Sequence, residues 1–528
     1  MGYTSFAYLG LLAASFFFYM ILPLKHRWKV LLLFSYAFYF LNSGKYIVFI
    51  LLSTVSIYLT GLMLNKIDDG FAVAKKGIPK ENKKEYKAVI AWQKKFVCVL
   101  AVLFNLGILV FLKYFNFLGG SVNGLLKLLH LSPSVPVLNL MLPLGISFYT
   151  MSAISYVVDV YRGKYRATDQ LGKVALFLVF FPHIVEGPIG RFDLLADQLY
   201  EGHKFNYNNM MLGLQLIFWG LFKKFVLADR ANMLVTTVFK NYMEYDGIYV
   251  VVAMLLYTLL LYAEFSGCMD IVMGSAQMFG ITMSKNFERP FISKTVSEFW
   301  RRWHMTLGSW FRDYVFYSVS LSKTFMKFSK KIKEKLSPFL GSMIPAAVAM
   351  FAVWFSTGIW HGASWKYVAY GLYYYVIMLI GMLIEPATVK VCEKIHLNRK
   401  SVGYRLFQLV RTFILVNIGM LMFRADTFSS FMHMLGSMFT GFSFAPVADG
   451  SIFEIGCDIK DFAVLIIGAL ILLAVGLYEE KGHSVRETVA RQNIVVRWIC
   501  YYALIFIVLI FGAYGRGYQA AGFIYAQF

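Results

Sequence analysis

Long apolar segments recur along the whole chain. A helix needs about 17 to 25 apolar residues to cross a hydrocarbon core of roughly 30 Å. The clearest runs of that length lie at 5–24, 46–64, 96–112, 137–160, 209–228, 248–266, 365–384, 406–423, 461–478 and 498–514. Shorter or interrupted runs lie at 30–42, 171–190 and 345–360. The pattern predicts an all-α polytopic membrane protein with roughly eleven to thirteen membrane segments.

The composition agrees with this prediction. The 528 residues are 59% hydrophobic and 15% charged, with a mean hydropathy of +0.61, whereas a soluble domain carries about a quarter charged residues. No Gly/Ser-rich linker or low-complexity tract marks a soluble domain, so we expect one membrane domain over 1–528. The run 5–24 lacks a basic n-region and a small-residue cleavage site, and we expect it to be retained.

The cysteines suggest no covalent framework. They are scattered, with no CxxC pair and no histidine at ligand spacing, so we expect neither disulfides nor a zinc site. They are Cys98, Cys268, Cys392, Cys457 and Cys500.

The net charge of +22 is concentrated in short loops between the apolar runs. Basic residues gather at 25–29, 66–95, 323–335, 394–405 and 481–497. Such loops face the cytosol under the positive-inside rule, so we expect contact with an anionic leaflet and no nucleic-acid partner. Both chain ends then lie outside, and the runs before and after 323–335 approach from opposite faces of the membrane. Basic cytosolic loops would also attract a phosphate-bearing donor such as coenzyme A.

The segment 296–316 places a histidine among tryptophans. If one helix covered it, residues spaced by three and four would form an apolar stripe. They are Trp300, Trp303, Leu307, Trp310 and Tyr314. Arg302 falls off this stripe, four residues after Glu298, where the two can pair. His304 lies at the edge of the stripe and is predicted to point inward, although an interfacial helix with a structural histidine fits the pattern too.

A second histidine ends the apolar run of 351–371. His361 stands between Trp360 and Gly362, and an ionisable group at membrane depth commonly faces an internal cavity. Neutral imidazole can accept a proton near neutral pH, which suits deprotonation of a hydroxyl. Gly358 and Gly362 permit close backbone approach, which a channel or tight helix packing would use.

Two further segments carry buried polar groups. In 180–192, His183 and Glu186 lie between Pro182 and Pro188, which predicts a broken or re-entrant helix. We expect His183 to shape the site there. In 262–291, carboxylates stand close to an apolar run and need cationic partners. They are Glu264 and Asp270, with Arg289 or Arg301 as the candidate partners.

Several motifs in order resemble the membrane-bound O-acyltransferase family, in particular the bacterial alginate O-acetyltransferases and the related D-alanyl transfer protein of teichoic acids. The resemblance covers about 110–430. The motifs are 143-PLGISFYTMSAISYVVDVYRG-163, 180-FFPHIVEGPIGRF-192, 219-WGLFKKFVLADR-230, 262-YAEFSGCMDIVMG-274, 286-NFERPF-291, 298-EFWRRWHMTLGSWFRDYVF-316, 354-WFSTGIWHGASW-365 and 423-FRA-425.

The resemblance implies tilted helices around a central tunnel, with His361 and His304 as the catalytic residues. We expect further residues to line the substrate channel, namely His183, Glu186, Glu264, Asp270, Trp303, Trp360 and Arg302. It implies no bound cofactor and no metal. The donor would be acetyl-CoA or another acyl thioester, and the acceptor an exported polysaccharide such as alginate or peptidoglycan. An extracytoplasmic partner with an SGNH-type fold is expected. The chain itself is expected in the cytoplasmic membrane of a bacterium.

Other functions fit some of these features. D-alanyl transfer to teichoic acid is the nearest alternative. A polysaccharide or lipid transporter (a flippase) would also use broken helices and intramembrane charges, but no internal repeat is visible. Eukaryotic members that acylate lipids or secreted proteins pair the WHG-type histidine with an upstream Asn or Asp, whereas this chain has RWH. A non-catalytic scaffold is the remaining alternative.

Overall fold

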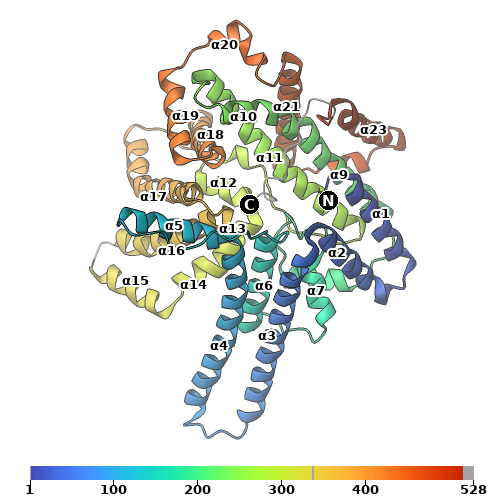
Figure 1. Ribbon diagram of the computed structural model, residues 1–528, viewed down its shortest axis with the longest axis vertical. Helices are drawn as coiled ribbons and strands as arrows, with labels where there is room; N and C mark the ends of the chain where they lie inside the picture. The colour runs from blue at the N-terminus through green and yellow to red at the C-terminus, as the bar shows by residue number, and fades with distance from the viewer. Residues whose placement is uncertain (1, 336–337, 515–528) are drawn as a thin grey trace. The chain divides into compact units, whose positions relative to one another are not determined.

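The computed structural model describes residues 2–335 and 338–514, and over these residues the chain is helical without a strand (Figure 1). The predicted all-α fold is therefore confirmed. The helices in the first part of the chain are α1 (Phe6–Ile21), η1 (Leu24–His26), α2 (Arg27–Ser43), η2 (Gly44–Tyr46), α3 (Ile47–Ala74), α4 (Lys83–Leu109), η3 (Val110–Tyr114), α5 (Phe115–Leu128), α6 (Ile146–Tyr161), α7 (Leu171–Val179), α8 (Phe192–Tyr200), α9 (Tyr207–Leu221), η4 (Phe222–Ala228), α10 (Asp229–Lys240) and α11 (Gly247–Met278). The helices that follow are η5 (Pro290–Ile292), α12 (Val296–Arg302), α13 (Met305–Phe311), η6 (Arg312–Phe316), α14 (Tyr317–Ser320), α15 (Lys323–Lys335), α16 (Pro338–His361), α17 (Trp365–Lys394), α18 (Val402–Arg424), α19 (Phe428–Thr440), α20 (Ala445–Ala448), η7 (Ser451–Phe453), α21 (Ile459–Glu480), α22 (Val485–Ala490) and α23 (Ile494–Phe511).

Nine helical stretches of the described chain are long and apolar enough to cross a membrane. They are Leu24–Ala74, Lys83–Leu128, Tyr207–Lys240, Gly247–Met278, Phe339–His361, Trp365–Lys394, Val402–Arg424, Ile459–Glu480 and Ile494–Phe511, and the shorter apolar helix is Phe6–Ile21. The chain is a multi-pass membrane protein.

The nine stretches are fewer than the eleven to thirteen segments predicted, for local reasons. The runs 30–42 and 46–64 join in one continuous stretch. The run 137–160 is helical only from Ile146, because prolines at 133, 136 and 143 disfavour a helix before that point. The run 171–190 is helical only up to Val179.

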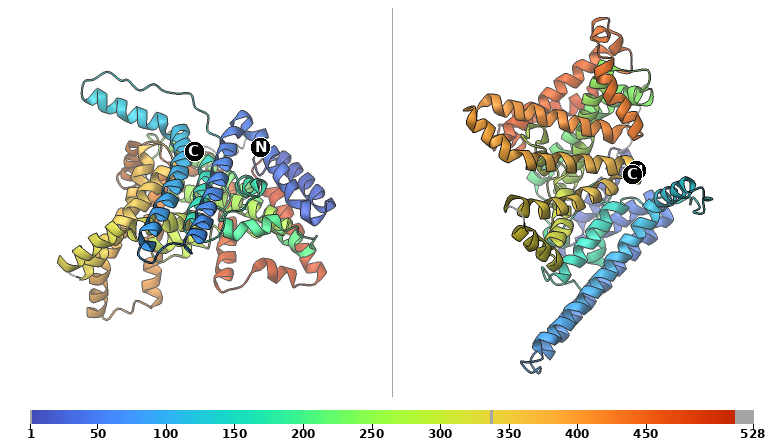
Figure 2. Two further views of the ribbon diagram at one scale, coloured as in Figure 1. Left: turned by 90° about the horizontal axis from the view of Figure 1, so that it is seen from below. Right: turned by 90° about the vertical axis from the view of Figure 1, so that its left-hand side faces the viewer.

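The described chain divides into two compact units. One comprises the residues up to Leu214 together with Val272–Ser284, and the other comprises Gln215–Ile271 with the residues from Lys285 onward. One domain over the whole chain stays a prediction. In the first unit, α3 and α4 lie side by side as a long hairpin, and α6 packs against both (Figure 2).

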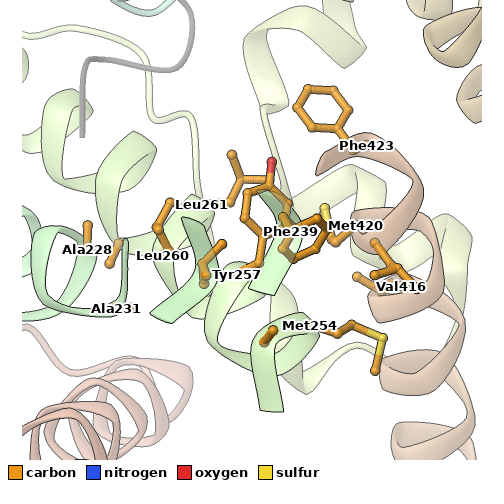
Figure 3. Close-up of a cluster of buried hydrophobic side chains, with 14 of the residues drawn as sticks. Ala228, Ala231, Phe239, Met254, Tyr257, Leu260, Leu261, Val416, Met420 and Phe423 are labelled. Carbon is orange, nitrogen blue, oxygen red and sulfur yellow. The ribbon is translucent and has the colours of Figure 1, made fainter. Parts of the chain in front are cut away.

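The second unit has a hydrophobic core to which η4, α10, α11 and α18 contribute many of the buried side chains. Figure 3 draws some of these buried side chains. The labelled residues are Ala228, Ala231, Phe239, Met254, Tyr257, Leu260, Leu261, Val416, Met420 and Phe423. Phe423 is one of the core residues that contact the site described next.

Candidate active site

His361 is the last residue of α16 and precedes the short turn into α17. The two helices approach closely because glycine stands at their crossing. A Cβ atom at Gly358 would lie 2.5 Å from the carbonyl oxygen of Tyr367, and one at Gly371 would lie 2.4 Å from that of Trp354. The hairpin therefore holds the end of α16, and with it the imidazole, close against α17.

Aromatic rings surround His361, which is 4% exposed. The ring centroid of Trp360 lies 5.2 Å from that of His361, Phe423 lies at 5.3 Å and Tyr370 at 5.7 Å. Tyr370 and Phe423 stand nearly perpendicular to the imidazole, at 90° and 88°. Contact with three aromatic rings limits the rotation of the imidazole.

The segment 296–316 is not one helix, contrary to the prediction. Helix α12 ends at Arg302, Trp303 is extended, and His304 has left-handed backbone angles (φ 47°, ψ 51°) before α13 begins at Met305. An antiparallel bridge between Phe287 and Trp303 causes the break. The N–H of Glu288 donates to the carbonyl of Arg302 at 2.8 Å, and the N–H of Met305 donates to that of Asn286 at 2.9 Å.

The break places the His304 ring in a buried polar and aromatic pocket, where the residue is 2% exposed. Its Nδ1 lies 3.2 Å from Oδ1 of Asn286, and its ring centroid lies 4.8 Å from that of Phe265. Burial, with the charge of His361 as a secondary cause, holds the pKa of His304 well below its usual value. His304 is therefore neutral at neutral pH.

Trp360 joins the two predicted histidines. Its ring centroid lies 5.8 Å from that of His304 and 5.2 Å from that of His361. Both histidines belong to the second compact unit, although 56 positions of sequence separate them. The structure thus brings together three of the predicted site residues.

Trp303 and Arg302 lie beside this site and contribute to its frame. Trp303 stacks on Phe299 with ring centroids 5.4 Å apart and packs edge-on against Phe287. Arg302 forms ion pairs of 3.0 Å with Glu298 and with Glu480, which confirms the predicted pairing with Glu298. The ion pair with Glu480 links α12 to α21.

The carboxylates Glu264 and Asp270 have lysine partners, so the expectation of Arg289 or Arg301 was wrong. Lys224 contacts Glu264 at 3.3 Å and Asp229 at 2.9 Å. Lys223 contacts Asp270 at 2.5 Å. The π-helical turn η4 carries both lysines, and its widened turn directs them at α11.

The two arginines have other partners. Arg289 pairs with Glu480 at 2.5 Å and with Glu288 at 3.3 Å, and Arg301 donates to the Ser297 hydroxyl at 3.2 Å. Neither arginine is therefore paired with Glu264 or Asp270 of α11.

His183 and Glu186 belong to the first compact unit, where they lie in the turn that follows α7. The predicted helix break is confirmed, because α7 ends at Val179 before both prolines. Both side chains are buried, and burial lowers the pKa of His183 to about 4. A Cβ at Gly187 would meet the Cα of His183 at 2.3 Å, so the turn requires glycine there.

Four residues of the site were not singled out from the sequence. They are Asn286, Phe265, Tyr370 and Phe423. Asn286 opens the motif 286-NFERPF-291 and Phe423 opens 423-FRA-425, so their motifs were visible while their contacts were not. The aromatic positions are indistinguishable in sequence from the many that pack in the core.

Residues 166–423 match the sequence model of the MBOAT, membrane-bound O-acyltransferase family. The probable alginate O-acetylase AlgI of Pseudomonas syringae pv. tomato is 32% identical over 342 residues, which are 65% of this chain and 60% of that protein.

Two other relatives carry different names. The peptidoglycan O-acetyltransferase of Helicobacter pylori is 26% identical over 371 residues, covering 65% of each chain. The teichoic acid D-alanyltransferase of Bacillus subtilis is 31% identical over 255 residues, covering 47% of this chain and 61% of that protein. The chain thus spans about 60% of the length of the alginate O-acetylase it matches.

Proposed function

Because residues 166–423 of this chain belong to the membrane-bound O-acyltransferase family, we propose that the protein is an O-acyltransferase of the bacterial cytoplasmic membrane. It moves an acyl group, in the first instance acetyl, from a cytosolic donor across the membrane. The acyl group is destined for hydroxyls of an exported cell-surface polysaccharide, either an alginate-like exopolysaccharide or peptidoglycan. The likeness to an alginate O-acetylase and to a peptidoglycan O-acetyltransferase supports these acceptors.

One observation carries the proposal. Two buried histidines from separate helical segments contact the same indole ring, that of Trp360. Burying ionisable side chains in a membrane protein is costly, and such groups mark functional sites by default. A transporter would also bury polar groups, but family membership favours acyl transfer.

The mechanism follows from the chemistry of the two imidazoles. Acetyl-CoA or another acyl thioester presents its carbonyl carbon, and His361 removes the proton of the acceptor hydroxyl as general base. The oxygen attacks the carbonyl carbon, the C–S bond breaks, and the proton passes from His361 to the leaving sulfur. Such proton transfer contributes about 10²- to 10⁴-fold to the rate. His304 orients the donor or hydrogen-bonds the developing oxyanion.

We also propose an extracytoplasmic partner with an SGNH-type fold, which would pass the acyl group to the polymer. The basic loops support the orientation this needs, with both ends of the chain outside the cell. The C-terminal end itself lies outside the described residues.

D-alanyl transfer to teichoic acid is the second candidate function. The observation that favours it is the likeness to the teichoic acid D-alanyltransferases of Bacillus subtilis and Streptococcus thermophilus, which are 31% and 29% identical over their matched residues. The same histidine chemistry would serve either acyl group, because both reactions form an ester on a hydroxyl.

The test is ester analysis of the cell surface in cells that lack the native protein, complemented with this chain. We expect the intact chain to restore acetyl esters and His361→Ala to abolish them at equal membrane abundance. His396→Asn is the matched control, because His396 is an exposed histidine with a positive φ of 54° that asparagine tolerates. Restoration of D-alanyl esters alone would select the second candidate. Restoration of neither ester, or equal restoration by His361→Ala, would overturn the proposal.

A further inference from the structure

Asn286 sits at the junction of the segments that hold His304. It is 1% exposed, and its amide makes contacts on both sides. Oδ1 accepts from the backbone N–H of Thr306 at 3.1 Å and from the Thr306 hydroxyl at 2.8 Å. Nδ2 donates to the Met269 sulfur at 3.3 Å. A backbone N–H can only donate, so the atom facing Thr306 must be the oxygen, and the orientation of the amide is thereby decided.

The same oxygen decides the tautomer of His304. Nδ1 of His304 lies 3.2 Å from Oδ1 of Asn286, and an amide oxygen only accepts. Nδ1 must therefore carry a hydrogen. A neutral imidazole has one N–H and one lone pair, so the lone pair is on Nε2.

We propose that Asn286 is a positioning residue that holds His304 in the tautomer with hydrogen on Nδ1, so that Nε2 is a proton-accepting atom of the active site. This inference rests on the proposed function and refines it. In its neutral form, His304 cannot donate from Nε2 to an oxyanion, so of the two roles proposed for it above only the orientation of the substrate remains. It instead accepts the hydrogen of a substrate O–H or S–H group, and a proton taken up at Nε2 must leave by the same atom because Nδ1–H stays bonded to Asn286.

The backbone around the pair favours a positioning role. The carbonyl of Asn286 accepts from the N–H of Met305, and the side chain of Asn286 binds His304 and Thr306. One residue therefore contacts the three consecutive positions 304–306. His304 adopts left-handed backbone angles, which are uncommon for non-glycine residues, and the bonds from Asn286 hold the backbone on both sides of it. The imidazole is thus held by main-chain and side-chain bonds to the same asparagine.

The surroundings leave His304 neutral. The titratable group that acts on it is His361 on α16, which disfavours a second positive charge. Phe265 on α11, Trp360 on α16 and Thr306 on α13 carry no titratable group, and the next residue to Phe265, Glu264, is paired with Lys224. Nε2 therefore keeps its lone pair at neutral pH.

The experiment compares Asn286→Leu with Asn286→Asp, measuring acyl transfer against pH in membranes that contain the full chain. Leucine removes the hydrogen-bond acceptor, so both tautomers of His304 become available. We therefore expect kcat to fall about 10²-fold or more, with little change in KM for the donor. For comparison, loss of the group that fixes the histidine tautomer in a serine protease costs about 10⁴-fold in kcat. Aspartate still accepts from Nδ1, and its charge favours the protonated ring. We expect Asn286→Asp to stay active at high pH and to move the acidic limb of the pH–rate profile up by about one unit or more.

Matched variants separate positioning from folding. Asn398→Asp makes the same change at an exposed loop asparagine and should leave the profile unmoved. His304→Asn keeps a residue that tolerates the left-handed angles and can donate to Asn286, but it has no counterpart of Nε2. We expect His304→Asn to accumulate in the membrane like the intact chain and to be inactive. This variant tests the role of Nε2 even if Asn286→Asp does not accumulate.

Three results would overturn the inference: an active His304→Asn, a fully active Asn286→Leu, or equal losses in both Asn286 variants without a shift of the acidic limb. In each case the intact chain would still be active, so only the inference would fail. An intact chain with no acyl transfer in the same membranes would instead count against the proposed function.

Discussion

The crossing of α16 and α17 depends on a contact that only glycine permits at position 358. An added Cβ would lie 2.5 Å from the Tyr367 carbonyl oxygen, whereas ordinary van der Waals contact begins at 3.4 Å. Gly358→Ala would therefore force the helices about 0.9 Å apart at this point. The neighbouring atoms belong to the backbone of α17, so no side-chain rotation can relieve the clash.

The cost should appear more in activity than in stability. Overpacking of this kind destabilises by about 1–3 kcal/mol. His361 lies three residues beyond Gly358 at the end of the same helix, so a displacement there moves the imidazole relative to Trp360 and Phe423. A misplacement of about 1 Å can reduce a rate by about 10²-fold. We expect Gly358→Ala to lose about 10- to 100-fold in acyl transfer while still accumulating in the membrane.

The assay is the initial rate of ester formation in membranes, normalised to the amount of protein, alongside the thermal unfolding temperature in detergent. Gly381→Ala is the control, because Gly381 lies in α17 and a Cβ there meets nothing within 4 Å. That change should be neutral or stabilising by about 0.5–1 kcal/mol. If Gly358→Ala matched the intact chain in both rate and unfolding temperature, the close crossing would not be what positions His361.

Two further predictions concern buried charge. Lys224→Met leaves Asp229 and Glu264 without their shared cation, so we expect a loss of about 3–5 kcal/mol, seen as a lower unfolding temperature and lower membrane abundance. Lys330→Met, on a side chain that is 81% exposed, should change neither, and equal effects of the two would refute the assigned pairing. His183 has its pKa lowered by burial from 6.5 to about 4, so the unfolded chain binds its proton first as the pH falls. The stability it supports is complete above pH 6.5 and is lost progressively toward pH 4, by up to about 3 kcal/mol, and His183→Gln should flatten the unfolding temperature over this window. An unchanged slope in His183→Gln would show that another group controls it.

Local features of the fold and site were predictable from the sequence. The apolar run 345–360 ends where α16 ends, and the pairing of Glu298 with Arg302 needs only helical spacing. The break before Pro182 follows from backbone chemistry. Each of these depends on residues within one or two turns of one another.

Features that depend on distant residues were not predictable in this way. The hydrophobic periodicity of 296–316 predicts one helix, because it contains no information about distant segments. In the structure, 286–288 forms hydrogen bonds with 302–305, and Trp303 is extended rather than helical. The lysine partners of Glu264 and Asp270 were hidden inside the apolar run 209–228. A π-helical turn there changes which faces the lysines occupy, and no hydropathy pattern signals such a turn.

The bridge between Phe287 and Trp303 sets what evolution or an engineer can change around His304. Its hydrogen bonds join main-chain atoms, so the side chain of Glu288 can vary without weakening the backbone contacts that position the histidine, whereas the ring of Phe287 also packs against Trp303. A single-residue insertion or deletion within either paired stretch, 286–288 or 302–305, would shift these hydrogen bonds out of register and displace His304. Both paired stretches should therefore be free of insertions and deletions among functional variants of this chain, even where their letters differ.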